Sequence, residues 1–145
     1  PPIFEGNVLC AVAYQGRIAC FDLKEGGQLL WSREFSSSTG IAVDGRYLYA
    51  TDAKSGIHAF DRMTGGSLWK QEKLLHRNVT APAVNRGIIA VGDLDGIVHL
   101  LRREDGDFAA RVSVGSDAII APPQPYESGF IVQTTGGVVA YIAVE

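Results

Sequence analysis

The sequence predicts an all-β protein built from β-propeller blades, each of them a four-stranded antiparallel sheet. Three observations predict this class. One pattern of residues returns about every 40 positions, its segments are short and rich in Val, Ile, Tyr and Phe, and 17 of the 145 residues are Gly. Strands that recur at this period are typical of propeller blades. Gly is the usual residue of the tight turns between such strands, because it adopts positive φ without a steric penalty.

The strands of each repeat follow one another in the same order. The first strand is expected at 2–4, 41–43, 81–84 and 121–126, and the second at 8–14, 47–51, 88–91 and 130–132. The third strand begins after an aligned glycine, and these glycines are Gly16, Gly56, Gly96 and Gly137. The fourth follows turns at 25–27, 64–66 and 105–106. We therefore expect blades over about 1–37, 38–77 and 78–116, and an incomplete blade of three strands over 117–145.

Two other all-β architectures fit the pattern less well. A β-sandwich also has evenly spaced strands, but it does not require the sequence itself to repeat. A parallel β-helix has coils much shorter than the period seen here.

Asp and Trp recur at fixed places in the first two repeats. Asp22 and Asp61 end the third strand, and Trp31 and Trp69 begin the fourth. We interpret these residues as structural: the carboxylates accept hydrogen bonds from turn amides, and the indoles pack between blades. The alternative is a metal ligand set with a tryptophan platform for a cofactor ring. The third repeat has Arg102 and Ala110 at these places, so such a set would be incomplete there, and we expect no cofactor or metal.

The remaining candidate groups have simple interpretations. Asp93 and Asp95, followed by Gly96, resemble the start of a calcium loop, but strand-like residues follow directly and favour a hairpin turn. His58 and His99 fall on third strands and His76 in a loop, with no nucleophile spaced to act with them, so we expect no catalytic residue. Cys10 and Cys20 fall on neighbouring strands. A disulfide across the strands is open to them, but we expect two small buried apolar residues, because disulfide geometry is restrictive.

Composition excludes several functional classes. With 13 basic and 16 acidic residues, the net charge is −3, so no nucleic-acid partner is expected. The longest apolar run, 138–144, is too short to span a bilayer. The chain starts inside an apolar segment, without a charged leader, so we expect it to be a fragment of a longer protein.

Several stretches resemble a known family. Residues 61–69, Asp-Arg-Met-Thr-Gly-Gly-Ser-Leu-Trp, closely resemble the repeat of pyrroloquinoline-quinone-type propellers. Two further stretches resemble the BamB family of outer-membrane β-barrel assembly lipoproteins more specifically. They are Leu-Leu-His-Arg at 74–77, followed by Thr-Ala-Pro-Ala-Val at 80–84, and Val-Gly-Asp-Leu-Asp-Gly-Ile-Val-His at 91–99. The likeness covers essentially the whole chain and corresponds to the C-terminal part of that family.

The resemblance implies a non-enzymatic scaffold on the periplasmic side of the bacterial outer membrane, lipid-anchored in the full-length protein. Its implied partners are the periplasmic domains of BamA, other assembly subunits and strands of unfolded outer-membrane proteins. The family's acidic contact motif and its lipidated cysteine have no counterpart in this chain. There are two alternatives: a fragment of a quinoprotein dehydrogenase, or a sensor or binding domain of a larger receptor. The dehydrogenases have a vicinal cysteine pair, which is absent here because Cys10 and Cys20 are ten residues apart.

The incomplete fourth repeat predicts surfaces that need a cover. Three blades and an incomplete fourth leave apolar end faces and an unpaired strand edge, so self-association that completes a ring is one hypothesis. The other is that the remainder of a longer chain covers them.

Charged residues gather at the turns, which form two rims. His76 and Arg77 lie in the longest connection between blades and are candidates for contact with a partner, with a solvated linker as the alternative.

Overall fold

The computed structural model describes residues 2–13, 16–24, 26–36 and 40–144. These residues form strands and turns without a helix. The first sheet contains β1 (Ile3–Glu5), β2 (Val8–Ala13), β3 (Arg17–Asp22) and β4 (Gln28–Glu34). The second contains β5 (Ile41–Asp44), β6 (Tyr47–Thr51), β7 (Ile57–Asp61) and β8 (Ser67–Gln71). The third contains β9 (Ala83–Asn85), β10 (Ile88–Gly92), β11 (Ile97–Arg102) and β12 (Phe108–Ser113), and the last β13 (Gln124–Tyr126), β14 (Gly129–Gln133) and β15 (Val139–Ala143).

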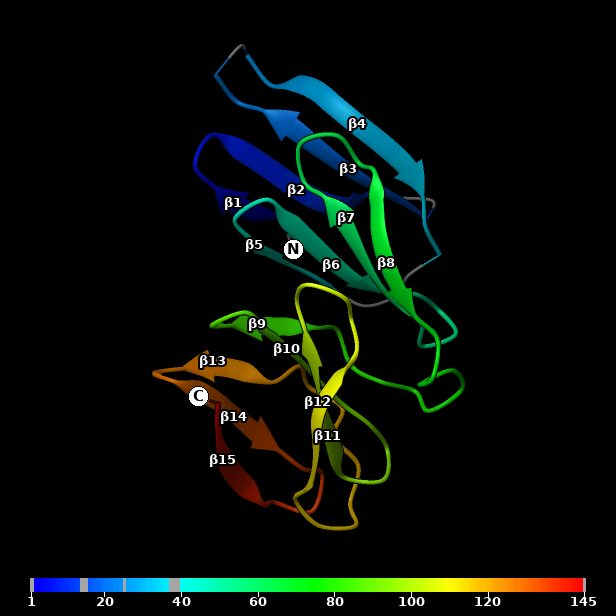
Figure 1. The fold of residues 1–145 in the computed structure, drawn as a ribbon, viewed down its shortest axis with the longest axis vertical. Coiled ribbons are helices and arrows are strands. Elements are labelled where there is room, and N and C mark those ends of the chain that lie inside the picture. The colour runs from blue at the N-terminus through cyan, green and yellow to red at the C-terminus, as the bar shows by residue number, and fades with distance from the viewer. Residues whose placement is uncertain (1, 14–15, 25, 37–39, 145) are drawn as a thin grey trace.

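Each sheet is a simple antiparallel meander in which sequential strands are neighbours. The four sheets follow one another as blades, with β1, β5, β9 and β13 as the inner strands (Figure 1). The prediction of an all-β propeller is therefore confirmed. The expected blade boundary at residues 37 and 38 lies outside the described residues. The boundaries at 77/78 and 116/117 fall between β8 and β9 and between β12 and β13.

The meander creates two rims. We call the edge that carries the links between blades the connector rim. It contains 35–36, 40, 72–82 and 114–123, together with the turns from second to third strands at 52–56, 93–96 and 134–138. We call the opposite edge, with the turns from first to second and third to fourth strands, the hairpin rim. Each residue's place in the repeat therefore determines the rim on which it lies.

Apolar side chains of adjacent blades meet in three separate cores. Val8, Ile18 and Trp31 pack against Leu48 and Phe60 between the first and second blades. The second core joins the second and third blades through side chains that include Tyr49, Ile57, Ile89, Val91 and Leu101. The third joins the third and fourth blades through side chains that include Ala90, Val98, Leu100, Phe130 and Ile142. The middle strands of the second and third blades, β6, β7, β10 and β11, are thus covered on both faces, which explains why their sequences are mostly apolar rather than alternating.

The two cysteines form a disulfide, so the expectation of two unlinked apolar residues is wrong. Cys10 on β2 and Cys20 on β3 are directly opposite each other in the register, with their Cα atoms 4.1 Å apart. Directly opposed residues on antiparallel strands bring their side chains to the same face and within bonding reach. The bond is buried in the core between the first two blades.

At the hairpin rim, tryptophan side chains bond to arginine carbonyls and so join the first blade to the second and the second to the third. Trp31 Nε1 donates a hydrogen bond to the carbonyl of Arg62 at 2.6 Å, and Trp69 Nε1 donates to the carbonyl of Arg103 at 2.7 Å. The indoles lie against Gly65 and Gly106 of the following blade, where a Cβ atom would collide with the ring. Because both glycines also have positive φ, they satisfy two requirements at once.

Candidate interaction surface

The repeat aspartates lie at the hairpin rim and stabilise turns. Asp22 accepts a hydrogen bond from the amide of Lys24 at 2.9 Å. Asp61 accepts from the amides of Met63 and Thr64 at 2.9 and 3.3 Å, and it also pairs with Arg46 at 3.0 Å. Burial opposes ionisation of Asp61, but these donors together hold its pKa below the ordinary value. The aspartates and tryptophans are thus engaged with turns and with neighbouring blades.

The aligned glycines lie at the other rim, before each third strand. Gly16, Gly96 and Gly137 have φ of 74°, 77° and 94°, a region that side chains rarely allow. Gly56 does not have positive φ, but a Cβ atom there would lie 2.6 Å from a carboxylate oxygen of Asp52. Glycine is therefore needed at this repeat position for two different reasons: positive φ at Gly16, Gly96 and Gly137, and lack of room for a Cβ atom at Gly56.

Two Asp–His pairs, which the sequence analysis missed, occupy equivalent places on the connector rim. His58 Nε2 lies 2.8 Å from Asp52 Oδ2, and His99 Nε2 lies 2.7 Å from Asp93 Oδ2. In both pairs the aspartate begins the turn and the histidine lies six residues later on the third strand. The signal was available, because Asp and His recur at this spacing one repeat apart.

Asp93 is the most completely engaged polar group of this rim. Its side chain is fully buried and accepts from the amides of Asp95 and Ile97 at 2.9 and 3.1 Å, so it closes the hairpin turn predicted for 93–96. Arg77 Nη2 lies 2.9 Å from Oδ2. Burial opposes ionisation of Asp93, but the hydrogen bonds from His99, Ile97 and Arg77 hold its pKa below the ordinary value. Burial lowers the pKa of His99 below 6.5, and the bond with Asp93 only partly offsets this effect.

The structure separates the two residues considered for partner contact. His76 is exposed, with φ of 68°, and its amide donates to the carbonyl of Lys54 at 2.9 Å. Arg77 instead turns toward the protein and pairs with Asp93 and Asp95. The connector that carries them is therefore fixed to the turns of the second and third blades.

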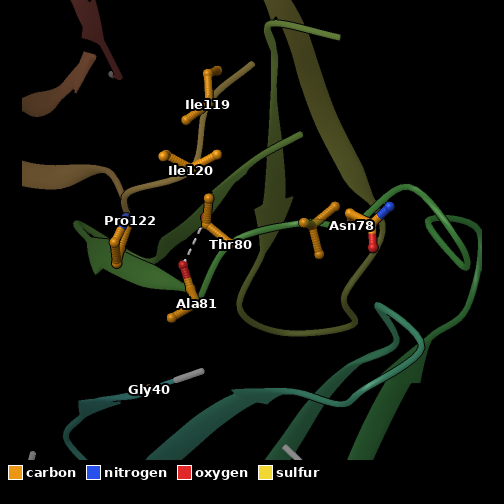
Figure 2. A pocket seen from close by; sticks show the side chains of 8 residues that line it. Gly40, Asn78, Thr80, Ala81, Ile119, Ile120 and Pro122 are labelled. Carbon is orange, nitrogen blue, oxygen red and sulfur yellow. Dashed lines mark hydrogen bonds between the residues drawn. The ribbon is translucent and has the colours of Figure 1, made fainter. Parts of the chain in front are cut away.

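A depression of about 350 Å³ lies beside this connector (Figure 2). Gly40, Asn78, Val79, Thr80, Ala81, Ile119, Ile120 and Pro122 line it. Figure 2 shows Ile119 and Ile120 across from Thr80 and Ala81, which come from the connector before β9. Ile120 is 69% exposed, an unusual position for a large apolar side chain. The Thr80 hydroxyl donates to the carbonyl of Ala81 at 2.9 Å.

The lining of this depression is suited to contact with another molecule's apolar surface. It contains no acid, base or thiol, so it offers none of the usual groups for proton transfer or covalent chemistry.

Across the part of the chain that the structure describes, no three His, Cys, Asp or Glu side chains cluster as they would around a metal ion. No helix in that part is long and apolar enough to cross a membrane. We take the connector rim around Ile120 and His76 as the candidate interaction surface.

The blade repeat and the Trp–Gly joints define a propeller of the pyrroloquinoline-quinone-like repeat class. A family model described as outer membrane protein assembly factor BamB matches residues 1–71. BamB of Bordetella pertussis is 48% identical over 136 residues, which are 94% of this chain and 35% of that protein. The chain therefore belongs to the BamB family of outer membrane protein assembly factors, and it spans about a third of the length of the curated relatives it matches.

Solved structures agree with this assignment. BamB from Moraxella catarrhalis superposes with a TM-score of 0.90 at 29% identity, covering 99% of this chain and 42% of that one. The computationally designed Ika4 protein superposes with a TM-score of 0.81 at 17% identity. That match covers 99% of this chain and 89% of Ika4, and at this identity it concerns the fold alone.

Proposed function

We propose that the protein is a non-enzymatic scaffold subunit of the outer-membrane protein assembly machinery. In this role it docks on the periplasmic domains of BamA and assists insertion of outer-membrane β-barrel proteins. The observation that carries the proposal is membership of a family whose relatives are named outer membrane protein assembly factors. Other assembly subunits and strands of unfolded outer-membrane proteins are further proposed partners, the latter by pairing with an exposed sheet edge.

Two features of the chain support a scaffold rather than an enzyme. Asp93 and His99, which are 0% and 1% exposed, are hydrogen-bonded to each other and help to close a hairpin. The cysteines are ten residues apart and joined across two strands, unlike the vicinal pair of a quinoprotein dehydrogenase. Titration with pyrroloquinoline quinone should therefore leave the absorption spectrum of the cofactor unchanged, and a saturable change would favour the enzyme.

The disulfide also supports the proposed compartment. Disulfides persist in oxidising environments such as the bacterial periplasm and are rare in the cytosol. Cys10 and Cys20 are both linked, and none of the described residues is a free cysteine. We therefore propose a location on the periplasmic side of the outer membrane, with a lipid anchor in the full-length protein.

Pull-down with purified BamA periplasmic domains tests the docking. We propose that the connector rim makes the contact, since Ile120 and His76 are exposed there. Ile120→Asp should abolish capture, because a carboxylate cannot enter an apolar contact without losing its hydration. Met63→Asp is the matched control, since Met63 is a similarly exposed apolar residue on the hairpin rim.

Each outcome has a separate meaning. Capture by the unchanged protein and by Met63→Asp, but not by Ile120→Asp, supports both docking and the assigned rim. Capture by Ile120→Asp at the unchanged level places the contact elsewhere. Failure of the unchanged protein to be captured contradicts the docking itself.

A further inference from the structure

A second cavity on the connector rim, between the second and third blades, carries an excess of positive charge. It has a volume of about 290 Å³ and is lined by Lys73, Leu74, Arg77, His99, Phe108 and Arg111. Arg77 is balanced by the buried carboxylate of Asp93. Among the described residues, neither Lys73 nor Arg111 has an ion-pair partner. Two cationic groups therefore face this cavity without a counter-charge.

The equivalent place one blade earlier shows that this excess is not a general property of the repeat. The cavity beside His58, of about 270 Å³, is lined by Glu34, Asp52 and Lys54 among others. Its two carboxylates outnumber its one ammonium group. The second blade also has a cation on its outer strand, Lys70 opposite His58, as the third has Arg111 opposite His99, but Lys70 pairs with Glu72 at 3.4 Å. The third blade therefore differs because Arg111 has no such partner among the described residues and because Lys73 on the preceding connector adds a second cation.

His99 provides a second and independent indication of a ligand. Its side chain is 1% exposed and lines the cavity, and its Nδ1 is buried without a hydrogen-bond partner in the described structure. Nε2 lies against Asp93, and an ionised carboxylate only accepts hydrogen bonds, so Nε2 carries the proton. Nδ1 of the neutral ring is then an acceptor. A buried acceptor without a donor is unfavourable, so a ligand that donates there is favoured.

We propose that this cavity binds a carboxylate of a polypeptide together with a neighbouring backbone N–H. The carboxylate lies between Lys73 and Arg111, and the N–H donates to Nδ1 of His99. Leu74 and Phe108 form an apolar wall beside the bound segment. The volume is at the small end for ligand sites, so it suits one side chain or one chain end rather than a whole cofactor.

The need for both an anion and a donor selects this class of ligand. A polypeptide places a carboxylate and an amide N–H a few atoms apart, in a side chain of Asp or Glu or at the chain end. A fully ionised phosphomonoester has the charge but no donor for Nδ1. Inorganic phosphate near neutral pH keeps an O–H group that could donate, so it is tested in parallel. The site exists whether or not the protein docks on BamA, so peptide titration and BamA pull-down fail separately.

Titration of the folded protein with short peptides tests the proposal. The probes are acetyl-Ala-Glu-Ala-amide, which carries a side-chain carboxylate, acetyl-Ala-Ala-Ala with a free chain end, and acetyl-Ala-Gln-Ala-amide, which carries neither. Binding is followed by calorimetry and by the imidazole ¹⁵N resonances of the protein. At least one of the carboxylate peptides should bind and move the Nδ1 resonance of His99, and comparison of the two identifies the source of the carboxylate.

Two charge-removing variants and one control locate the ligand. Arg111→Gln and Lys73→Gln should each weaken binding about tenfold, as expected for loss of a charge-assisted hydrogen bond. Lys54→Gln, which removes a lysine from the equivalent cavity of the second blade, should bind as the unchanged protein does. Both substituted residues of the site are exposed, so these variants should fold.

Four results would overturn the proposal. They are equal binding of the neutral peptide, unchanged affinity in Arg111→Gln, a His99 resonance that stays in place during binding, and absence of binding by both carboxylate peptides. Inorganic phosphate is titrated in parallel. If it binds and the carboxylate peptides do not, the cavity is a phosphate site and the polypeptide assignment is wrong.

Discussion

At the scale of single residues, a tryptophan of one blade and a glycine of the next form the joint between blades. Trp69 lies in the middle of β8, the fourth strand of the second blade, packs against Gly106 and donates to the carbonyl of Arg103. Trp31 makes the same set of contacts one repeat earlier with Gly65 and Arg62. The third blade has Ala110 at this place, so its joint with the fourth blade lacks the indole. That joint depends on the third core, which includes Phe130, and on hydrogen bonds that the side chain of Asn85 donates to carbonyls of the fourth blade.

Trp69→Ala should therefore destabilise the protein by about 3–5 kcal/mol, the range measured for loss of a large packed aromatic side chain. The substitution removes both the ring that covers Gly106 and the hydrogen bond to Arg103. Leu68→Ala, at the exposed neighbouring position, should change stability by less than about 0.5 kcal/mol. Urea denaturation followed by fluorescence measures both, and a stable Trp69→Ala variant would contradict the structural role.

The Asp93–His99 pair predicts a loss of stability on acidification. Because the folded-state pKa of His99 is below 6.5, the unfolded chain takes up the proton first as pH falls. Stability is thus present near neutral pH and declines below about 6.5, by at most about 1.4 kcal/mol per pH unit for each such histidine. His58 contributes in the same direction. Asp93, with its lowered pKa, adds a further loss below 3.8.

Denaturation at several pH values between 5 and 7.5 checks this prediction. His99→Gln should lower stability at neutral pH but flatten its pH dependence, since Gln does not titrate. His76→Gln, at an exposed position, should keep the full dependence. An unaltered slope in His99→Gln would show that the buried ring does not carry the effect.

At the scale of strands and turns, the positions of the turns and the starts of the third strands could be predicted from the sequence, because they depend on local chemistry. Glycines at fixed spacing marked the start of β3, β7, β11 and β15, because each turn there needs positive φ or has no room for a Cβ atom. The register between strands could not be predicted from these glycine spacings. The pairing of Cys10 with Cys20, and of Asp93 with His99, depends on which residues lie opposite or fold back within a hairpin. The spacing of aromatic and acidic residues in the sequence does not specify either pairing.

The disulfide between β2 and β3 should stabilise the first blade by about 2–3 kcal/mol, mainly by restricting the unfolded chain. The Cys10→Ala, Cys20→Ala double variant should lose this amount in urea denaturation. Thiol labelling and mass spectrometry provide the direct check. The native protein should take up no label before reduction, and the unfolded, reduced protein should take up two. Labelling of the unfolded protein without a reductant would contradict the bond.

At the scale of the whole molecule, the two faces of the blades differ in how they are covered. On the third blade, Ala90 and Leu100 face the fourth blade and are buried by it. The corresponding face of the fourth blade carries Val139 and Tyr141, which are 66% and 47% exposed, and the outer edge of β15 has no strand paired to it among the described residues. The same kind of surface is thus covered in one blade and open in the next.

When only these 145 residues are expressed, we therefore expect self-association, with a blade of a second copy covering the face that carries Val139 and Tyr141. Burial of these side chains is favourable, and a head-to-tail contact closes a ring if the rotation between copies permits it. Val139→Lys combined with Tyr141→Lys should shift the population to monomer, because two buried ammonium groups would lie in the contact. The control is Leu94→Lys, at an exposed position of the connector-rim turn 93–96, away from both end faces. Light scattering and sedimentation at micromolar concentration measure the mass, and a well-folded monomer of the unchanged chain would contradict the expectation.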